Sequence, residues 1–131
     1  LYRPSVVASI GQAIQDGCTV VIVTASPSFA ISDCVSDLPV IVLGTEFEKE
    51  GNIYTGLLKS ENCYGKEKVN RINEWARSNK IVLSVQSAWS DHFSDFDMLS
   101  LSAKRYWVGG EQLQALVMDH DPEANFVHTE Q

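Results

Sequence analysis

The first residues that could carry chemistry are Thr24, Ala25, Ser26 and Pro27, which directly follow the apolar run 20–23. A hydroxyl group beside backbone N–H groups at the start of a helix makes a natural binding site for an anion. The competing explanation is that Thr24 only ends a strand and Ser26 only caps the helix, which is the commonest role of serine there. Taken alone, this segment favours capping.

Two lysines, Lys66 and Lys68, stand at the expected start of another helix. A cation in the first turn opposes the helix dipole, so an anionic ligand or an aspartate would explain its presence. Most surface lysines are simply solvated, and that explanation is open for both of them.

A third candidate is the acidic pair Asp91 and Asp95. If this segment is helical, residues four positions apart lie on one face, where two carboxylates repel each other. A hard cation such as Mg²⁺ would relieve the repulsion through oxygen ligands. The alternative is one capping and one surface aspartate, and the nearby Asp97 shows that acidic residues are common here.

Composition narrows the class of protein. The 131 residues are 44% hydrophobic and 21% charged, which suits one compact domain rather than a disordered tail or a coiled coil. The net charge of −7 argues against a nucleic-acid partner, which requires a basic surface. No apolar run is long enough to span a membrane. The three cysteines, Cys18, Cys34 and Cys63, are widely spaced, which predicts free thiols and a cytoplasmic location.

Helical and strand-like patterns alternate along the chain. Strands are expected at residues 19–23, 40–43, 81–85 and 105–108, and a β-hairpin at 46–56. A first helix is expected to begin near Pro4 and to end at Asp16-Gly17. Further helices are expected at residues 26–37, 64–78, 93–101 and 111–118, followed by a polar tail. This order predicts a three-layer, Rossmann-like α/β fold, a parallel sheet flanked by helices, with the ligand at the carboxyl ends of the strands. The three histidines and three tryptophans are assigned no role in catalysis or metal binding.

The three segments, in this order, resemble the haloacid dehalogenase (HAD) superfamily, and more narrowly its phosphoserine-phosphatase-like branch. Residues 20–27 resemble the family's second motif, an apolar strand ending in Thr or Ser. Residues 62–69 resemble the third motif, a lysine at a helix start, and residues 88–99 the fourth, an acidic pair after a strand. Residues 44–56 are similar to the hairpin between the second and third motifs of this branch.

The resemblance implies roles for individual residues. Thr24 would donate a hydrogen bond to the transferring phosphoryl group, with the Ala25 backbone N–H assisting. Lys68 would neutralise charge around the phosphate, with Lys66 as the competing candidate. Asp91 would bind Mg²⁺, and Asp95 would either hold the water shell of the metal or orient Lys68.

One family feature has no counterpart. The nucleophile of the family lies in an Asp-x-Asp motif at the end of an N-terminal strand, and no such motif precedes Thr24; where the tripeptide occurs, as at Asp95-Phe96-Asp97, it lies later in the chain. The helical cap usually found after that motif is missing as well. We therefore expect a partial HAD core at residues 1–118, a polar tail at 119–131, and a chain that begins partway through a larger protein. Because the family places the first-motif strand at the centre of the sheet, we also expect self-association.

The resemblance implies a Mg²⁺-dependent phosphatase that acts on a small phosphorylated substrate through a phospho-aspartate on a residue absent from this chain. The chain alone is then expected to be inactive. The alternative from another class is a non-catalytic HAD-like binding or interaction module. A third interpretation, an unrelated nucleotide-binding α/β domain, is disfavoured because no glycine-rich phosphate loop follows any strand.

Overall fold

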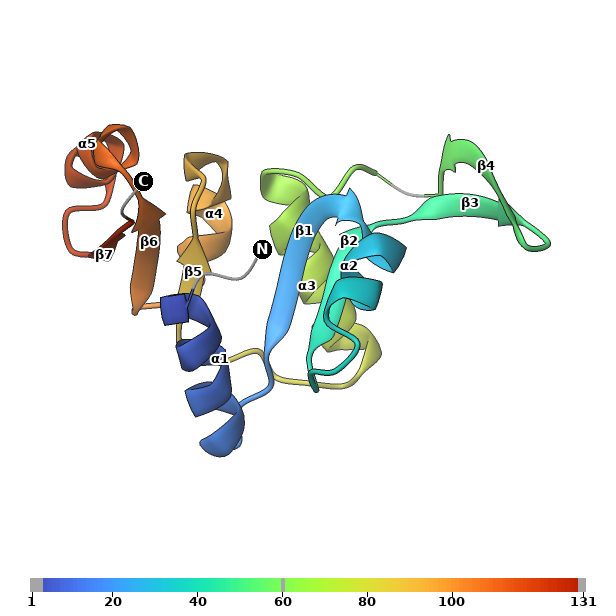
Figure 1. The fold of residues 1–131 in the computed structure, drawn as a ribbon, viewed down its shortest axis with the longest axis horizontal. Helices are drawn as coiled ribbons and strands as arrows, with labels where there is room; N and C mark the ends of the chain where they lie inside the picture. Colours follow the sequence, from blue (N-terminus) through green and yellow to red (C-terminus); the bar gives the residue numbers. More distant parts are fainter. Residues whose placement is uncertain (1–3, 60, 130–131) are drawn as a thin grey trace. The chain divides into compact units, whose positions relative to one another are not determined.

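The computed structural model describes residues 4–59 and 61–129, which form two compact units (Figure 1). The first unit ends at Cys63 and the second begins at Tyr64. Each unit is described by itself. In the described part of the chain, no helix combines the length and the apolar character that crossing a membrane requires.

The first unit contains a pair of parallel strands with a helix packed against both (Figure 1). Its first four elements are α1 (Pro4–Gln15), β1 (Val21–Pro27), α2 (Ser28–Cys34) and β2 (Ile41–Thr45). The strands pair in register from Val21 with Ile41 to Val23 with Leu43, and pairing resumes at Pro27 with Thr45.

Between the two paired stretches, residues 24–26 of β1 stand opposite the single residue Gly44 of β2. We call residues 24–26 the β1 bulge. The bulge approaches Gly44 so closely that a Cβ atom there would lie 2.8 Å from the Ser26 carbonyl oxygen and 2.9 Å from the Ser28 Cα. Only glycine fits this position without moving the bulge.

The prediction that Ser26 caps a helix beginning at Pro27 is wrong. Pro27 still belongs to β1, because it pairs with Thr45 after the bulge, and α2 begins only at Ser28. The helix also ends earlier than expected, at Cys34. The Ser26 N–H donates to Thr24 Oγ1 instead, so the β1 bulge is held by its own side chain.

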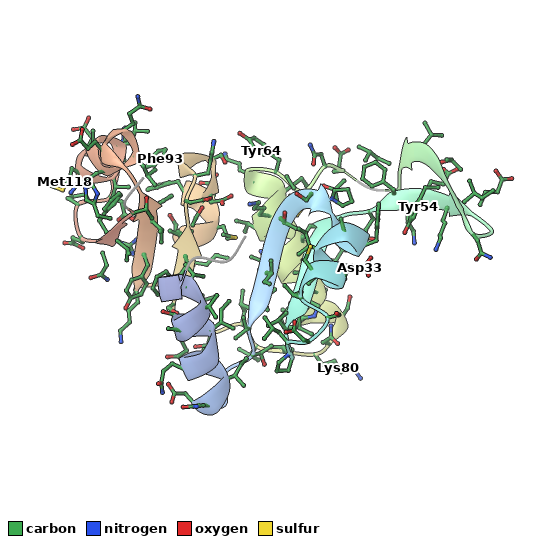
Figure 2. All side chains as sticks on the ribbon, viewed as in Figure 1. Asp33, Tyr54, Tyr64, Lys80, Phe93 and Met118 are labelled. Carbon is green, nitrogen blue, oxygen red and sulfur yellow. The ribbon has the colours of Figure 1, made fainter. Side chains whose placement is uncertain are left out.

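The predicted hairpin is confirmed as β3 (Phe47–Glu50) and β4 (Ile53–Leu58), which pair antiparallel. Gly51 turns the chain between them with a φ of 63°, a conformation that favours glycine. Tyr54 of β4 faces α2 (Figure 2), where its ring stacks on Phe29 at a centroid distance of 4.5 Å. The hairpin is thereby anchored to the helix that follows the β1 bulge.

The second unit is a parallel three-stranded sheet with helices, and it has a small aromatic core (Figure 1). Its elements are α3 (Lys66–Ser78), β5 (Ala88–Ser90), the short 3-10 turn η1 (Phe93–Asp95), α4 (Phe96–Leu99), β6 (Arg105–Gly109), α5 (Glu111–His120) and β7 (Asn125–His128). The sheet order is β5-β6-β7. Leu99, Trp107 and Val117 form the buried centre, and the Phe93 ring (Figure 2) stacks on Trp107 at 5.4 Å.

The strand predicted at residues 81–85 is wrong. This segment forms only an isolated parallel bridge, Val85 with Ser102, and the strand lies at Ala88–Ser90 instead. An apolar segment becomes a strand only where a neighbour offers a hydrogen-bonding ladder, and no strand in the described residues pairs with 81–85 beyond that bridge. Val82 is accordingly 94% exposed.

The segment predicted as a polar tail from Asp119 contains regular secondary structure over the described residues. Helix α5 continues to His120, and β7 pairs with β6 from Tyr106 with Asn125 to Gly109 with His128. The limit predicted at residue 118 therefore falls inside α5, whereas residues 130 and 131 lie outside the described part. The overall prediction of an α/β fold with parallel strands, helices and a β-hairpin is confirmed.

Candidate functional site

Thr24 stands in the β1 bulge at the carboxyl end of β1, half-buried. Its Oγ1 atom accepts a hydrogen bond from the Ser26 N–H at 3.0 Å. Since the hydroxyl oxygen acts as the acceptor in this bond, its own hydrogen can donate to another acceptor, such as a ligand oxygen. The neighbouring Ala25 is exposed, which leaves this side of the bulge open to solvent.

A second hydroxyl, that of Thr45 at the end of β2, holds the β1 bulge from within. Thr45 is only 2% exposed, and its Oγ1 lies 2.7 Å from the carbonyl oxygen of Ala25. The same oxygen accepts from the Cys63 N–H at 2.9 Å. Sequence reasoning missed Thr45, although a threonine that ends a second apolar strand is the same signal that drew attention to Thr24.

Lys68 is a buried lysine on α3. Its side chain is 11% exposed, and Nζ lies 2.7 Å from Oδ1 of Asp95. The position follows from helical spacing, since Lys68, Ile72 and Ala76 form the buried face of α3. Lys66, two residues earlier, is exposed. The structure thus brings together two of the predicted residues, Lys68 and Asp95. It also distinguishes the two candidate lysines, because Lys68 is buried and Lys66 is exposed.

Asp95 is held at the end of η1 by several local interactions. Its Oδ2 accepts from the Ser90 hydroxyl at 2.6 Å, and its backbone N–H donates to the His92 carbonyl at 3.1 Å. The His92 ring caps the turn by accepting from the Ser94 N–H. Phe93 anchors the same turn in the core. His92 therefore has a structural role as the cap of η1.

Asp91 lies in the bend after β5 with its side chain exposed, and η1 starts only at Phe93. Asp91 thus lies outside the helical turn, and the condition under which Asp91 and Asp95 would share one helix face is not met. Both oxygens of Asp95 already face Lys68 or Ser90, so Asp95 as placed does not fit as a direct metal ligand. Among the described residues, no group of three or more His, Cys, Asp or Glu side chains could hold a metal. Asp91 by itself fits the chemistry of Mg²⁺, which is often bound by one or two carboxylates plus phosphate and water.

Among the described residues, pKa shifts are resolved elsewhere, at Asp121 and Arg105. The Arg105 guanidinium, followed by the Trp107 indole N–H, donates hydrogen bonds that hold the pKa of Asp121 below its ordinary value. The hydrogen bond with Asp121 in turn raises the pKa of Arg105. This pair joins β6 to the loop before β7, and its role is structural.

The two units together define an α/β protein with polar residues at its strand ends and a buried lysine at a helix start. The family described as haloacid dehalogenase-like hydrolase matches residues 1–100, so the chain belongs to this family. A comparison with curated proteins found no match.

Solved structures show the same fold. A protein of unknown function from Bordetella pertussis Tohama I is similar with a TM-score of 0.82 at 20% identity, covering 92% of this chain and 56% of that one. A probable phosphoserine phosphatase from Vibrio cholerae, in its unliganded form, has a TM-score of 0.69 at 14% identity, covering 88% of this chain and 36% of that one. A substrate-bound phosphoserine phosphatase complex has a TM-score of 0.65 at 15% identity, covering 95% of this chain and 56% of that one. The chain thus spans about a third to just over half of these proteins.

Proposed function

We propose that this chain supplies the Thr24, Lys68 and Asp91 part of a Mg²⁺-dependent phosphatase acting on a small phosphomonoester. The observation that carries the proposal is the buried Lys68, held by Asp95 at 2.7 Å at the start of a helix. A lysine in that place is costly unless its charge is used, because the helix dipole and burial both disfavour it. The match of residues 1–100 to the haloacid dehalogenase-like hydrolase family supports the same assignment.

In the proposed reaction, Thr24 donates its hydroxyl hydrogen to a phosphoryl oxygen, and the backbone N–H of Ala25 assists. Lys68 has three N–H donors, so its ion pair with Asp95 leaves donors for the phosphate. Asp95 orients Lys68, and Asp91 holds the metal. When bound, Mg²⁺ neutralises charge on the transferring group. Positioning and charge neutralisation supply most of the catalysis in phosphoryl transfer.

The phospho-aspartate expected in this family would form on a residue that the sequence does not contain, because no Asp-x-Asp precedes Thr24. The 131-residue chain is therefore expected to bind inorganic phosphate in the presence of Mg²⁺ without hydrolysing an aryl phosphate or phosphoserine. Mg²⁺-dependent turnover by the purified chain would contradict the need for an external nucleophile.

Binding is tested with Thr24→Val and Lys68→Met, each of which should weaken phosphate binding, and with Lys66→Met as the matched control. Asp91→Asn should remove the effect of Mg²⁺ on phosphate affinity while leaving the metal-free affinity unchanged. Equal weakening by Lys66→Met and Lys68→Met would speak against the role of Lys68.

A non-catalytic HAD-like binding module is the second candidate, and the missing Asp-x-Asp favours it. This candidate predicts the same phosphate binding but no turnover by the whole gene product under any metal condition. Turnover by the whole gene product that is lost in Lys68→Met would decide for the enzyme.

A further inference from the structure

Thr45 is a buried hydroxyl at the end of β2 on which three contacts converge. Its Oγ1 lies 2.7 Å from the Ala25 carbonyl oxygen, 2.8 Å from Asn62 Oδ1 and 2.9 Å from the Cys63 nitrogen, which donates its N–H. All three partners lie 17 to 20 residues away in the sequence. A hydroxyl with this many distant partners is held in one orientation, because each contact restricts it from a different side.

The hydroxyl has one hydrogen, and two of the contacts compete for it. If it donates to Ala25, the Asn62 amide satisfies the network when it is turned by 180°, so that its NH₂ group donates to Thr45. Thr45 Oγ1 then donates once and accepts twice, which uses its full hydrogen-bonding capacity. The Ala25 carbonyl cannot change from acceptor to donor in this way, so it is the group to which the Thr45 hydroxyl donates.

A single peptide group connects Thr45 to Thr24. The carbonyl of Ala25, which faces Thr45, and the N–H of Ser26, which donates to Thr24 Oγ1 at 3.0 Å, belong to the same peptide unit. A peptide unit is planar, and the described peptide bonds include no cis bond, so this unit is trans and its C=O and N–H point in opposite directions. Fixing the carbonyl therefore fixes the N–H, and with it the acceptor side of the Thr24 hydroxyl.

We propose that Thr45 is a positioning residue for the phosphoryl site, which acts through the Ala25–Ser26 peptide to orient the Thr24 hydroxyl. This inference rests on the proposed function, in which Thr24 donates to a phosphoryl oxygen. With Ser26 bonded on the acceptor side, the hydrogen of Thr24 is directed away from the bulge. Hydrogen bonds in series also polarise one another, which makes the terminal hydroxyl a better donor.

The experiment has two readouts on the 131-residue chain. The first is the affinity for inorganic phosphate with Mg²⁺ present, and the second is the position of the backbone amide NMR signals of Ala25 and Ser26. Thr45→Val preserves the side-chain shape and removes the hydroxyl, and Thr45→Ser retains it. The matched control is Thr55→Val on the hairpin, where Thr55 Oγ1 accepts from the Leu57 N–H at 3.3 Å.

Thr45→Val should move the Ser26 amide signal towards that of a weaker hydrogen bond. It should also weaken phosphate binding about fivefold, as expected for one neutral hydrogen bond. Thr45→Ser should restore both readouts, and Thr55→Val should change neither. If Thr45→Val does not fold, Thr45→Ala takes its place, because the smaller side chain leaves room for a water molecule.

A double variant separates positioning from general stability. In a Thr24→Val background, Thr45→Val should weaken phosphate binding no further, because its effect passes through Thr24. An equal, additive loss in that background would overturn the proposal, and so would an unchanged Ser26 signal in the single variant. If wild type and Thr24→Val bind phosphate equally, the proposed function fails, whereas the Ser26 signal still decides whether Thr45 orients the bulge.

Discussion

Lys68 Nζ and Asp95 Oδ1 lie 2.7 Å apart, and both side chains are close to fully buried. Each charge makes the other tolerable, because an isolated buried charge is far more costly than a buried pair. Asp95 also offsets the unfavourable position of a cation in the first turn of α3. The amine is thus fixed in place, while Ser90 fixes the other carboxylate oxygen.

Removal of the Lys68 charge should destabilise the second unit. Lys68→Met leaves Asp95 buried without its partner, and we expect the free energy of unfolding to fall by about 3 kcal/mol. The control Lys66→Met alters an exposed lysine and should change it by less than about 0.5 kcal/mol. Urea unfolding of the three proteins measures the difference. Equal stability of the two variants would mean that the ion pair contributes nothing to folding.

The sequence predicted those elements whose signals are local. The hairpin has its turn residues, including Gly51, and α3 has a helical stripe through Ile72 and Ala76. That stripe also contained the information that distinguishes Lys68 from Lys66, because only Lys68 lies four positions before Ile72. Helical spacing was thus sufficient to choose the buried lysine.

What the sequence could not provide depends on partners that are distant along the chain. Residues 81–85 have strand composition but no ladder in the described residues, whereas the polar segment before β7 is ordered because Asp121 meets Arg105. The role of Thr45 also depends on distant residues, since the nearest of its hydrogen-bond partners along the chain is 17 residues away. The composition of each of these segments shows whether it is apolar or polar, but it does not show which distant residues the segment contacts.

A methyl group on Gly44 should displace the β1 bulge. The added Cβ would lie 2.8 Å from the Ser26 carbonyl oxygen and 2.9 Å from the Ser28 Cα, and both are backbone atoms that cannot rotate away. We expect Gly44→Ala to cost about 2 kcal/mol in unfolding free energy, as overpacking typically does, and to shift the Ser26 amide signal. Gly11→Ala, where no atom lies within 4 Å of the new Cβ, is the control. An unchanged Ser26 signal in Gly44→Ala would count against close packing at the bulge.

Stability should decrease at acid pH through Asp121. Hydrogen bonds from Arg105 and then Trp107 lower its pKa in the folded state, whereas the unfolded chain has an ordinary aspartate pKa of about 3.9. The unfolded state therefore takes up the proton first as pH falls. The contribution of Asp121 is complete above the unfolded pKa and is lost as pH drops through the folded pKa.

Asp121→Asn should therefore lower the unfolding free energy at pH 7 by about 3 kcal/mol, and the difference from wild type should shrink as the solution is acidified. The exposed Asp119 provides the control variant Asp119→Asn. A difference between wild type and Asp121→Asn that is the same at neutral and acid pH would show that ionisation of Asp121 is not the cause.

The open strand edges should make the chain self-associate. In the described residues, β1 pairs only with β2 and β5 only with β6, so each leaves one edge of a parallel sheet without a partner strand. The segment 81–85, which precedes β5 in the sequence, is mostly apolar, and Val82 is 94% exposed. Unpaired edges with apolar side chains favour pairing with a second chain. Light scattering should therefore show dimers or larger species whose fraction rises with protein concentration.

A charge in the exposed segment that precedes β5 in the sequence should oppose the pairing, so Val82→Lys is expected to shift the equilibrium towards monomer. Met118→Lys is the matched control, because Met118 of α5 is also an exposed apolar residue, at 65%, but lies on a helix (Figure 2). If association is driven by strand pairing, only Val82→Lys should weaken it, since general hydrophobic attraction would respond to both. A wild-type chain that stays strictly monomeric at crystallisation concentrations would contradict strand-mediated association.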